Sequence, residues 1–361
     1  MKKSIKIALI LIIVGIIFTG FAYAFGAETS VPIGRNKNRE KDIEEKIEKI
    51  EEDIEKKTDE WEKKIDEKVE SEVNPLKEGL FKDTTKAEVS ETFENIKEII
   101  IDAPFFDINI DESKRDNIIN INHDYLMKDN DKIYDLEYKV EGDRLIIEVP
   151  KSMKIEYDIK NLANIKYPNL QIDISMPEDL KLSILSDIAS LNIKDLDIEK
   201  LVVENKVGDI NLDDVEIDET KIDCNLGAIS FYDCDIDNFQ IESTMGSIYA
   251  SDTEFEQGKM NAKMGAMSFY DCEIKNTEIS AVMGSIEFSG EIKEENKIFA
   301  KMGSIELKID QKKANIGILA NSSVKNISLN GKEGPYSDER SNFKNFLEVS
   351  TEAGSIEIIT K

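Results

Sequence analysis

The sequence predicts an all-β protein: a single-stranded parallel β-solenoid with three short strands in each 19-residue coil, preceded by a membrane helix and a charged helical stalk. Three observations support this fold class. Glycines recur every 19 residues from Gly208 to Gly303. Within each interval, apolar and polar residues alternate with the period of a β-strand. Ahead of this repeat, the chain starts with an apolar run and continues with a segment rich in Glu and Lys.

Residues 1–27 are predicted to form a transmembrane anchor or a signal peptide. Three lysines in the first six residues precede an apolar run of about 20 residues, which suffices to cross a bilayer core. Lysines on this side direct the following chain out of the cytoplasm. We therefore expect a single-pass protein of the cell membrane with an extracytoplasmic C-terminal domain. The alternative is secretion after cleavage at Ala24, because Ala22 and Ala24 fit a signal-peptide cleavage pattern.

Residues 36–73 are predicted to form a charged helical stalk. Apolar residues between Ile43 and Trp61 follow heptad spacing, which is typical of a short coiled coil. One interpretation is a coiled coil that joins copies of the chain through residues 40–70. The other is a single helix that only spaces the C-terminal domain from the membrane. Asn74-Pro75 ends the helix, and residues 74–95 are predicted to be a linker.

The remaining chain is predicted to be β-structure in three parts. Residues 96–169 form an irregular N-terminal cap, residues 170–322 form the regular coils, and residues 323–361 form C-terminal coils that close the stack. When each coil is numbered 1 to 19 from its glycine, positions 3, 5, 10 and 15 are apolar and should point inward. Position 19, which is Met in four successive coils, is also assigned to the core. The inward positions have odd numbers in one part of the coil and even numbers in another. Each switch between odd and even predicts a corner, and one corner falls at the glycine.

Positions 7 and 9 of the coils predict an outward-facing row of carboxylates, which we call the acidic ladder. Its ten members are Asp195, Asp214, Asp233, Asp252, Asp271, Asp197, Glu216, Asp235, Glu254 and Glu273. Stacked like charges repel by roughly 0.9 kcal/mol at a 4.8 Å spacing in water. Weakly bound Ca²⁺ or a cationic peptide would offset this repulsion. The alternative is that the ladder serves solubility and that the position-7 aspartates serve only the turns.

Positions 2, 4 and 6 predict a second face, rich in Ser and Ala, that carries Tyr232, Tyr249 and Tyr270. Exposed tyrosines among small residues could stack on sugars or contact a partner protein. The alternative is the ordinary preference of tyrosine for strands. No other cofactor is expected.

Composition excludes several function classes. The net charge of −28 argues against nucleic acid as a partner, because phosphate recognition needs a basic surface. The chain has one histidine, His123, which we expect at the surface of the irregular segment. Cys224, Cys234 and Cys272 are expected as reduced core residues, too far apart to pair. No catalytic residues are predicted, and the chain is not expected to be an enzyme.

A resemblance supports this interpretation. The repeated Met-Gly-Ser-Ile, the segment Phe106–Ile110 and the closing segment Ala353–Ile358 resemble the β-strand-repeat "putative adhesin" family of Gram-positive bacteria, over about residues 95–361. That family includes accessory proteins of Lia-type envelope-stress systems. The resemblance implies an envelope protein with a β-solenoid and no established catalysis.

Together these observations predict a non-enzymatic cell-envelope protein whose extracytoplasmic solenoid binds, senses or scaffolds, with a role in the envelope-stress response. Its partners would be the membrane, envelope proteins, cationic peptides or a cell-wall polymer. A self-assembling filament is an alternative, and a polysaccharide-active enzyme is the least favoured one.

Overall fold

The computed structural model describes residues 85–112, 118–128, 131–153, 168–174 and 179–361, which all belong to a compact unit that begins at Leu76. The predicted anchor, the stalk and the first part of the linker lie outside the described residues. Within these ranges, no helix is long and apolar enough to span a membrane.

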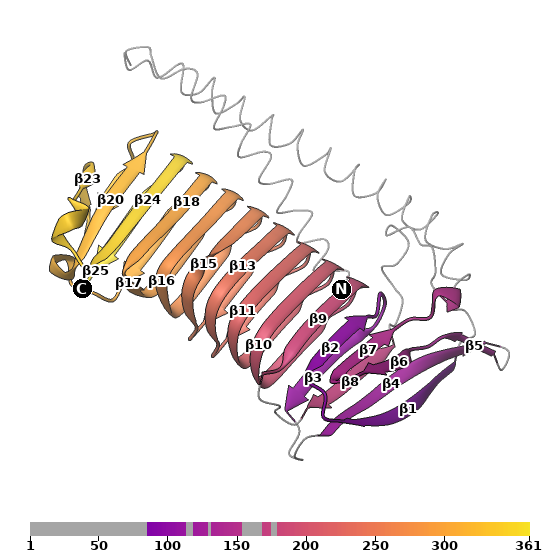
Figure 1. Cartoon of the computed structure of the whole chain (residues 1–361). Helices are drawn as coiled ribbons and strands as arrows, with labels where there is room; N and C mark the ends of the chain where they lie inside the picture. The colour runs from indigo at the N-terminus through magenta and orange to yellow at the C-terminus, as the bar shows by residue number, and fades with distance from the viewer. Residues whose placement is uncertain (1–84, 113–117, 129–130, 154–167, 175–178) are drawn as a thin grey trace, which may run out of the picture. The chain divides into compact units, whose positions relative to one another are not determined.

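The described part of the chain is an all-β fold (Figure 1). Its helical elements there are single 3-10 turns: η1 Lys151–Met153, η3 Lys313–Asn315 and η4 Arg340–Asn342. The strands are β1 Thr85–Glu94, β2 Glu98–Asp102, β3 Asp107–Glu112, β4 Ile118–Lys128, β5 Asp131–Tyr134, β6 Glu137–Glu141, β7 Arg144–Glu148, β8 Asn169–Ile174, β9 Lys181–Ile188, β10 Leu191–Val207, β11 Ile210–Leu226, β12 Ile229–Tyr232, β13 Asp235–Met245, β14 Ile248–Ser251, β15 Glu254–Met264, β16 Met267–Met283, β17 Ile286–Lys293, β18 Glu295–Met302, β19 Ile305–Ile309, β20 Ile316–Ser322, β21 Ile327–Leu329, β22 Lys332–Glu333, β23 Tyr336–Ser337, β24 Asn345–Ala353 and β25 Ile356–Thr360.

Successive coils pair in parallel, mostly at an offset of 19 residues. Leu191 lies opposite Ile210, Ile210 opposite Ile229, and Ile229 opposite Ile248, each 19 residues further along the chain. The pairing of β10 with β11 is interrupted at Asp195, Glu199 and Lys206. The predicted parallel β-structure is therefore observed between β10 and β19. Its 19-residue register is kept there except in β16 and β17, where a register shift after Phe269 pairs Cys272 with Gly290.

The core follows the predicted inward positions. Position 3 is filled by buried side chains throughout: Leu191, Ile210, Ile229, Ile248, Met267, Ile286 and Ile305. Aromatic rings from different coils meet inside the stack. The ring centroid of Phe255 lies 5.4 Å from that of Phe231 and 6.2 Å from that of Phe269. Both pairs are edge to face, which is a favoured arrangement of aromatic rings.

Two corners have clear chemical causes. The position-7 aspartates have positive φ angles between 49° and 55°, a left-handed conformation that Asp tolerates better than most residues. At the glycine corner, a Cβ on Gly246 would lie 1.8 Å from the carbonyl oxygen of Gly227 in the coil before. Only glycine permits this approach, which explains why glycine recurs at this position.

The assignment of position 19 to the core is wrong. Its side chains are partly exposed to solvent: Leu226 42%, Met245 39%, Met264 38%, Met283 43% and Met302 37%. The last inward side chain of each coil lies at position 17, as Ala262 and Ala281 show. The corner already begins at position 18. The alternation of inward and outward side chains therefore ends one residue earlier than the apolar pattern suggests.

At the N-terminal end, the coils do not stack in the order of the sequence. β2 lies between β9 and β7, and β3 lies between β10 and β8. The coil formed by β7 and β8 is therefore outermost, and it pairs in turn with antiparallel β6 and β4. This arrangement corrects two expectations. Leu170 pairs with Ile108 and does not continue the 19-residue register, and Thr85–Glu94 is strand β1, paired with β4, rather than part of a linker.

The C-terminal end repeats this interleaving. β24 lies between β18 and β20, and β25 lies between β19 and β21 (Figure 1). The last segment of the chain is therefore an inner coil, and β20 and β21 form the outer one. Short antiparallel strands β23 and β22 pair with this outer coil. The regular register ends at β19, earlier than the predicted residue 322.

Candidate functional site

The members of the acidic ladder lie on the outside of the stack. The position-9 carboxylates are aligned coil over coil, because Glu216 lies opposite Asp235 and Asp235 lies opposite Glu254. Nine of its ten members are exposed, and Glu273 is half-buried and paired with Lys293. Among the described residues, no group of three or more His, Cys, Asp or Glu side chains is placed to hold a metal ion. Calcium binding by the ladder stays a prediction.

The ladder nevertheless carries an electrostatic cost. Partial burial, followed by the charges of Asp237, Glu256 and Glu273, raises the pKa of Asp235 above its ordinary value. Partial burial, followed by the charges of Glu273 and Asp235, likewise raises the pKa of Glu254. The stacked carboxylates therefore disfavour their own charged forms, and a bound cation would relieve this.

The three predicted tyrosines come together in a cluster on the neighbouring face. The ring centroid of Tyr249 lies 5.4 Å from that of Tyr232 and 5.7 Å from that of Tyr270, with tilted rings. Tyr232 is 40% exposed. The Tyr270 hydroxyl donates a hydrogen bond to Glu287 at 3.0 Å, and this bond raises the pKa of Tyr270. We call these three residues the tyrosine cluster.

His123 is not at the surface, in contrast to the prediction. It lies in β4, is 2% exposed, and its Nε2 is 2.7 Å from Asp135 Oδ1. Its Nδ1 is 2.5 Å from the Tyr138 hydroxyl. Both ring nitrogens therefore have protein partners, which suits a structural role in the N-terminal sheet. Alternating apolar and polar residues from Ile119 to His123 signal this inward direction.

The cysteines are free and buried, as predicted. Burial raises the pKa of Cys224, Cys234 and Cys272 to about 11 in each case. Thiols of this kind are poor nucleophiles at neutral pH, because the thiolate is the reactive form.

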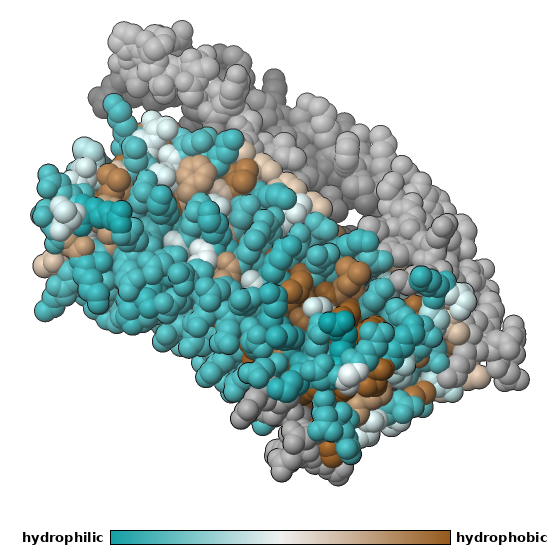
Figure 2. All heavy atoms as spheres, in the orientation of Figure 1, coloured by the Kyte–Doolittle hydropathy of each residue, from teal (hydrophilic) through white to brown (hydrophobic). Residues whose placement is uncertain are grey.

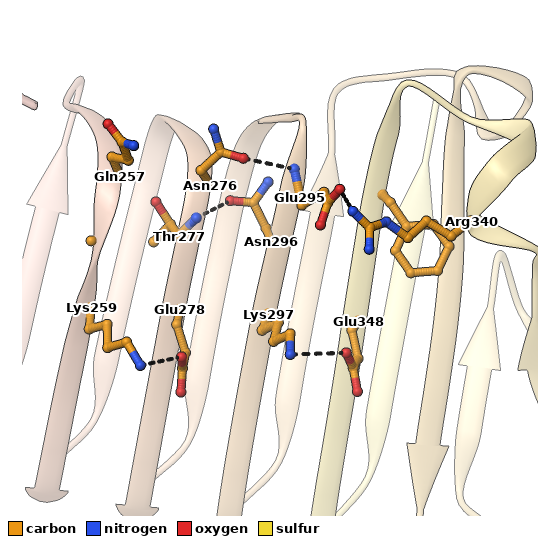
Figure 3. A pocket seen from close by; sticks show the side chains of 12 residues that line it. Gln257, Lys259, Asn276, Thr277, Glu278, Glu295, Asn296, Lys297, Arg340 and Glu348 are labelled. Carbon is orange, nitrogen blue, oxygen red and sulfur yellow. Dashed lines mark hydrogen bonds and ion pairs between the residues drawn. The ribbon is translucent and has the colours of Figure 1, made fainter.

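A groove on the third face was not predicted from the sequence (Figure 3). It has a volume of about 500 Å³, and it crosses β15, β16 and β18. Its lining residues are Gln257, Gly258, Lys259, Asn276, Thr277, Glu278, Glu295, Asn296, Lys297, Arg340, Phe346 and Glu348. Position 13 reads Leu201, Thr220, Phe239, Gly258 and Thr277 in successive coils, so small residues in this column do not by themselves mark the groove in the sequence.

The surface over the coils that faces the viewer in Figure 2 is mainly hydrophilic. The fold thus defines a class of protein: a stack of parallel β-coils that displays aligned side chains on its outer faces. The chain belongs to the Toastrack DUF4097 family, whose model matches residues 96–359. No curated protein matches the chain.

Several solved structures are similar. A protein from Parabacteroides distasonis described as a "putative lipid binding protein" is 16% identical, with a TM-score of 0.41, over 77% of this chain and 97% of that one. A "putative adhesin" from Bacteroides fragilis is 14% identical, with a TM-score of 0.37, over 77% and 98%. A "putative cell adhesion protein" from Clostridium sporogenes is 14% identical, with a TM-score of 0.27, over 77% and 100%.

Proposed function

We propose that this chain is a non-enzymatic binding module of the cell envelope, with a role in the envelope-stress response. Its coils would form a β-solenoid of three short strands per coil, presented outside the cell by an N-terminal membrane helix and a charged stalk, or secreted after cleavage at Ala24. The tyrosine cluster is the observation that carries this proposal.

The tyrosine cluster has the properties of a contact surface. Its rings touch one another across three coils, at 5.4 and 5.7 Å, and they are flanked by small residues such as Ser247 and Ala266. Paired strands fix the backbone beneath each ring, so that little side-chain freedom is lost on binding. A cell-wall polymer would stack its sugar faces on these rings, and an envelope protein would bury them.

Co-sedimentation of the purified full chain with insoluble cell-wall polysaccharide tests the proposal. Changing Tyr232, Tyr249 and Tyr270 to Ala should weaken binding at least about tenfold, as expected for aromatic residues at the centre of an interface. Changing the same three residues to Phe keeps the rings and should keep most of the binding. Equal binding by the Ala variant and the native chain would contradict the proposal.

We propose the acidic ladder as a second candidate, for cationic peptides or weakly bound Ca²⁺. The raised pKa values of Asp235 and Glu254 support it, because a cation would relieve the cost of charging them. A ligand that binds only the folded state raises the unfolding temperature. Titration with Ca²⁺ and with polylysine should therefore raise it, and Asp214→Asn with Asp233→Asn and Asp252→Asn should reduce the effect. An unfolding temperature that neither Ca²⁺ nor polylysine changes would mean that the ladder serves only solubility.

A further inference from the structure

We infer that the groove on the third face is a binding site for a glycan chain without net charge. It lies on a different face from the tyrosine cluster and does not depend on that proposal. The inference rests on the shape of the groove, on its local charge balance and on the polar groups that point into it (Figure 3).

The floor of the hollow is a column of small or short side chains. Gly258 lies in this column, and the space that a Cβ would take there is filled by the carbonyl oxygen of Phe239, at 2.4 Å, and by its ring, at 2.5 Å. The neighbouring coils place Thr277 and Asn296 in the same column, where they are buried. Gln257 and Asn276 stand at the rim with positive φ angles of 65° and 52°. These left-handed corners hold two planar amides at the same edge of the groove.

The charges of the groove cancel, in contrast to the rest of the chain. Lys259 lies 2.9 Å from Glu278, and Lys297 lies 3.6 Å from Glu348. Arg340, from the C-terminal 3-10 turn η4, pairs with Glu295. Three cations and three anions therefore line the groove of a chain whose net charge is −28. A polyanion would meet the field of the whole molecule, and a polycation would prefer the acidic ladder.

The groups in the groove suit hydroxyls. An amide offers both donors and an acceptor, and the Gln257 amide makes no protein hydrogen bond within the described residues. Exposed Lys–Glu pairs retain free donors and acceptors that bind water. An apolar ligand would remove this water and offer no hydrogen bonds in its place. Phe346 adds an apolar wall at the C-terminal end. A mixture of a few oriented polar groups with one ring is what an uncharged sugar needs.

The groove continues beyond one hollow. A second hollow of about 390 Å³ lies beside it and shares Lys259 and Glu278 with it. Gln240, Asn261 and Ser280 line this second hollow together with apolar Phe239, Ile241 and Met260, so its walls combine polar groups, amides among them, with apolar surface. Two adjoining hollows of this size favour a chain of several sugar units over a monosaccharide.

The test uses calorimetric titration of the full chain with the neutral hexamer of N-acetylglucosamine. Gln257→Gly combined with Lys259→Ala removes one amide and one ammonium, and glycine keeps the left-handed corner. We expect at least tenfold weaker binding. The control is Asn238→Ala with Lys221→Ala. It also removes one amide at position 12 and one ammonium at position 14, but outside the groove, and it should bind as the native chain does.

Three results would overturn the inference: no binding by the native chain at millimolar hexamer, equal binding by the groove variant, or loss of binding only when the tyrosine cluster is changed to Ala. The cationic hexamer of glucosamine separates the faces. The native chain and the groove variant should bind the cationic hexamer equally. If the native chain preferred the cationic hexamer over the neutral one and the groove variant lost this preference, the result would contradict a site for uncharged sugars. Unfolding temperatures of all variants verify that the fold is kept.

Discussion

Gly246 shows how a single residue sets the spacing of the coils. Its amide donates a hydrogen bond to the carbonyl oxygen of Met264, one turn further along the stack, at 3.0 Å, and its Cα faces the Gly227 carbonyl of the turn before. Each glycine of the column is thus enclosed by backbone on both sides. The recurrence of glycine therefore reflects close packing more than chain flexibility.

We expect Gly246→Ala to cost more than about 3 kcal/mol of unfolding free energy, because backbone rather than a flexible side chain blocks the new methyl group. Gly331→Ala is the matched control. Gly331 also has a positive φ, of 75°, but a Cβ there meets nothing within 4 Å. Its cost should stay near the roughly 1–2 kcal/mol of a left-handed alanine. Chemical denaturation measures both, and equal losses would contradict close packing of the glycine column.

Glu254 makes the ladder sensitive to pH. Its pKa is raised by burial and by the charges of Glu273 and Asp235, so the folded state holds its proton more tightly than the unfolded chain does. The stability that this protonation contributes is present below the unfolded pKa and is lost as pH rises through the folded pKa. Glu254→Gln cannot lose a proton.

The unfolding temperature of Glu254→Gln should therefore exceed that of the native chain near pH 7, with the difference shrinking towards about pH 4. The gain should stay below about 1 kcal/mol, because the group is largely exposed. Thermal unfolding across this pH range measures it. A difference that is independent of pH would mean that the stacked carboxylates do not repel.

At the scale of the element, the position-19 column is a row of partly exposed methionines beside the glycine corner. Met245, Met264 and Met283 lie opposite one another in successive coils. Met260 and Met267, from the same strands or the next, are buried at 1% and 0% exposure and serve as internal controls.

Dilute peroxide followed by peptide mass spectrometry should oxidise Met245, Met264, Met283 and Met302 first. Met260 and Met267 should react at least about tenfold more slowly, because sulfoxide formation follows exposure. Similar rates for the two groups would mean that position 19 lies in the core after all.

The elements also show what a sequence can reveal. Position 3 was predicted because Ile recurs with strand parity, and the position-7 corner was predicted because the parity changes there. Position 19 was misassigned because hydrophobicity alone does not reveal where a corner begins. The tyrosine cluster was predicted from one shared face. The groove combines the column of Gly258 with Arg340 from a distant segment, and no local pattern encodes this combination.

At the scale of the whole β unit, both ends are closed by interleaving. β2 and β3 are sandwiched at one end, and β24 and β25 at the other, so the first and last segments of the coils lie inside the stack. The outer coils pair with antiparallel strands β4, β6, β22 and β23. Covered edges oppose strand addition, which makes the filament alternative less favourable than a discrete binding module. A periodic sequence cannot reveal this order, because each coil could stack on any other.

Self-association is accordingly expected to depend on residues 40–70 and not on the coils. Light scattering of residues 28–361 with and without residues 40–70 measures this, with a monomer expected after their removal. Persistent oligomers of the shortened chain would show that the β unit itself associates.

The interleaved stack is the central claim, and disulfide trapping tests it most directly. Glu306 lies opposite Glu357, and Ser328 lies opposite Glu357 on the other side. Glu306→Cys with Glu357→Cys should form a disulfide, since paired strands are about 4.8 Å apart. Glu306→Cys with Ser328→Cys should not, because two strand spacings, about 9.6 Å, exceed the roughly 7 Å limit. The three native cysteines are buried and present in both variants, so any disulfide that they form appears equally in both. Bonding in the second pair but not in the first would show that the coils wind in sequence order and would contradict the account.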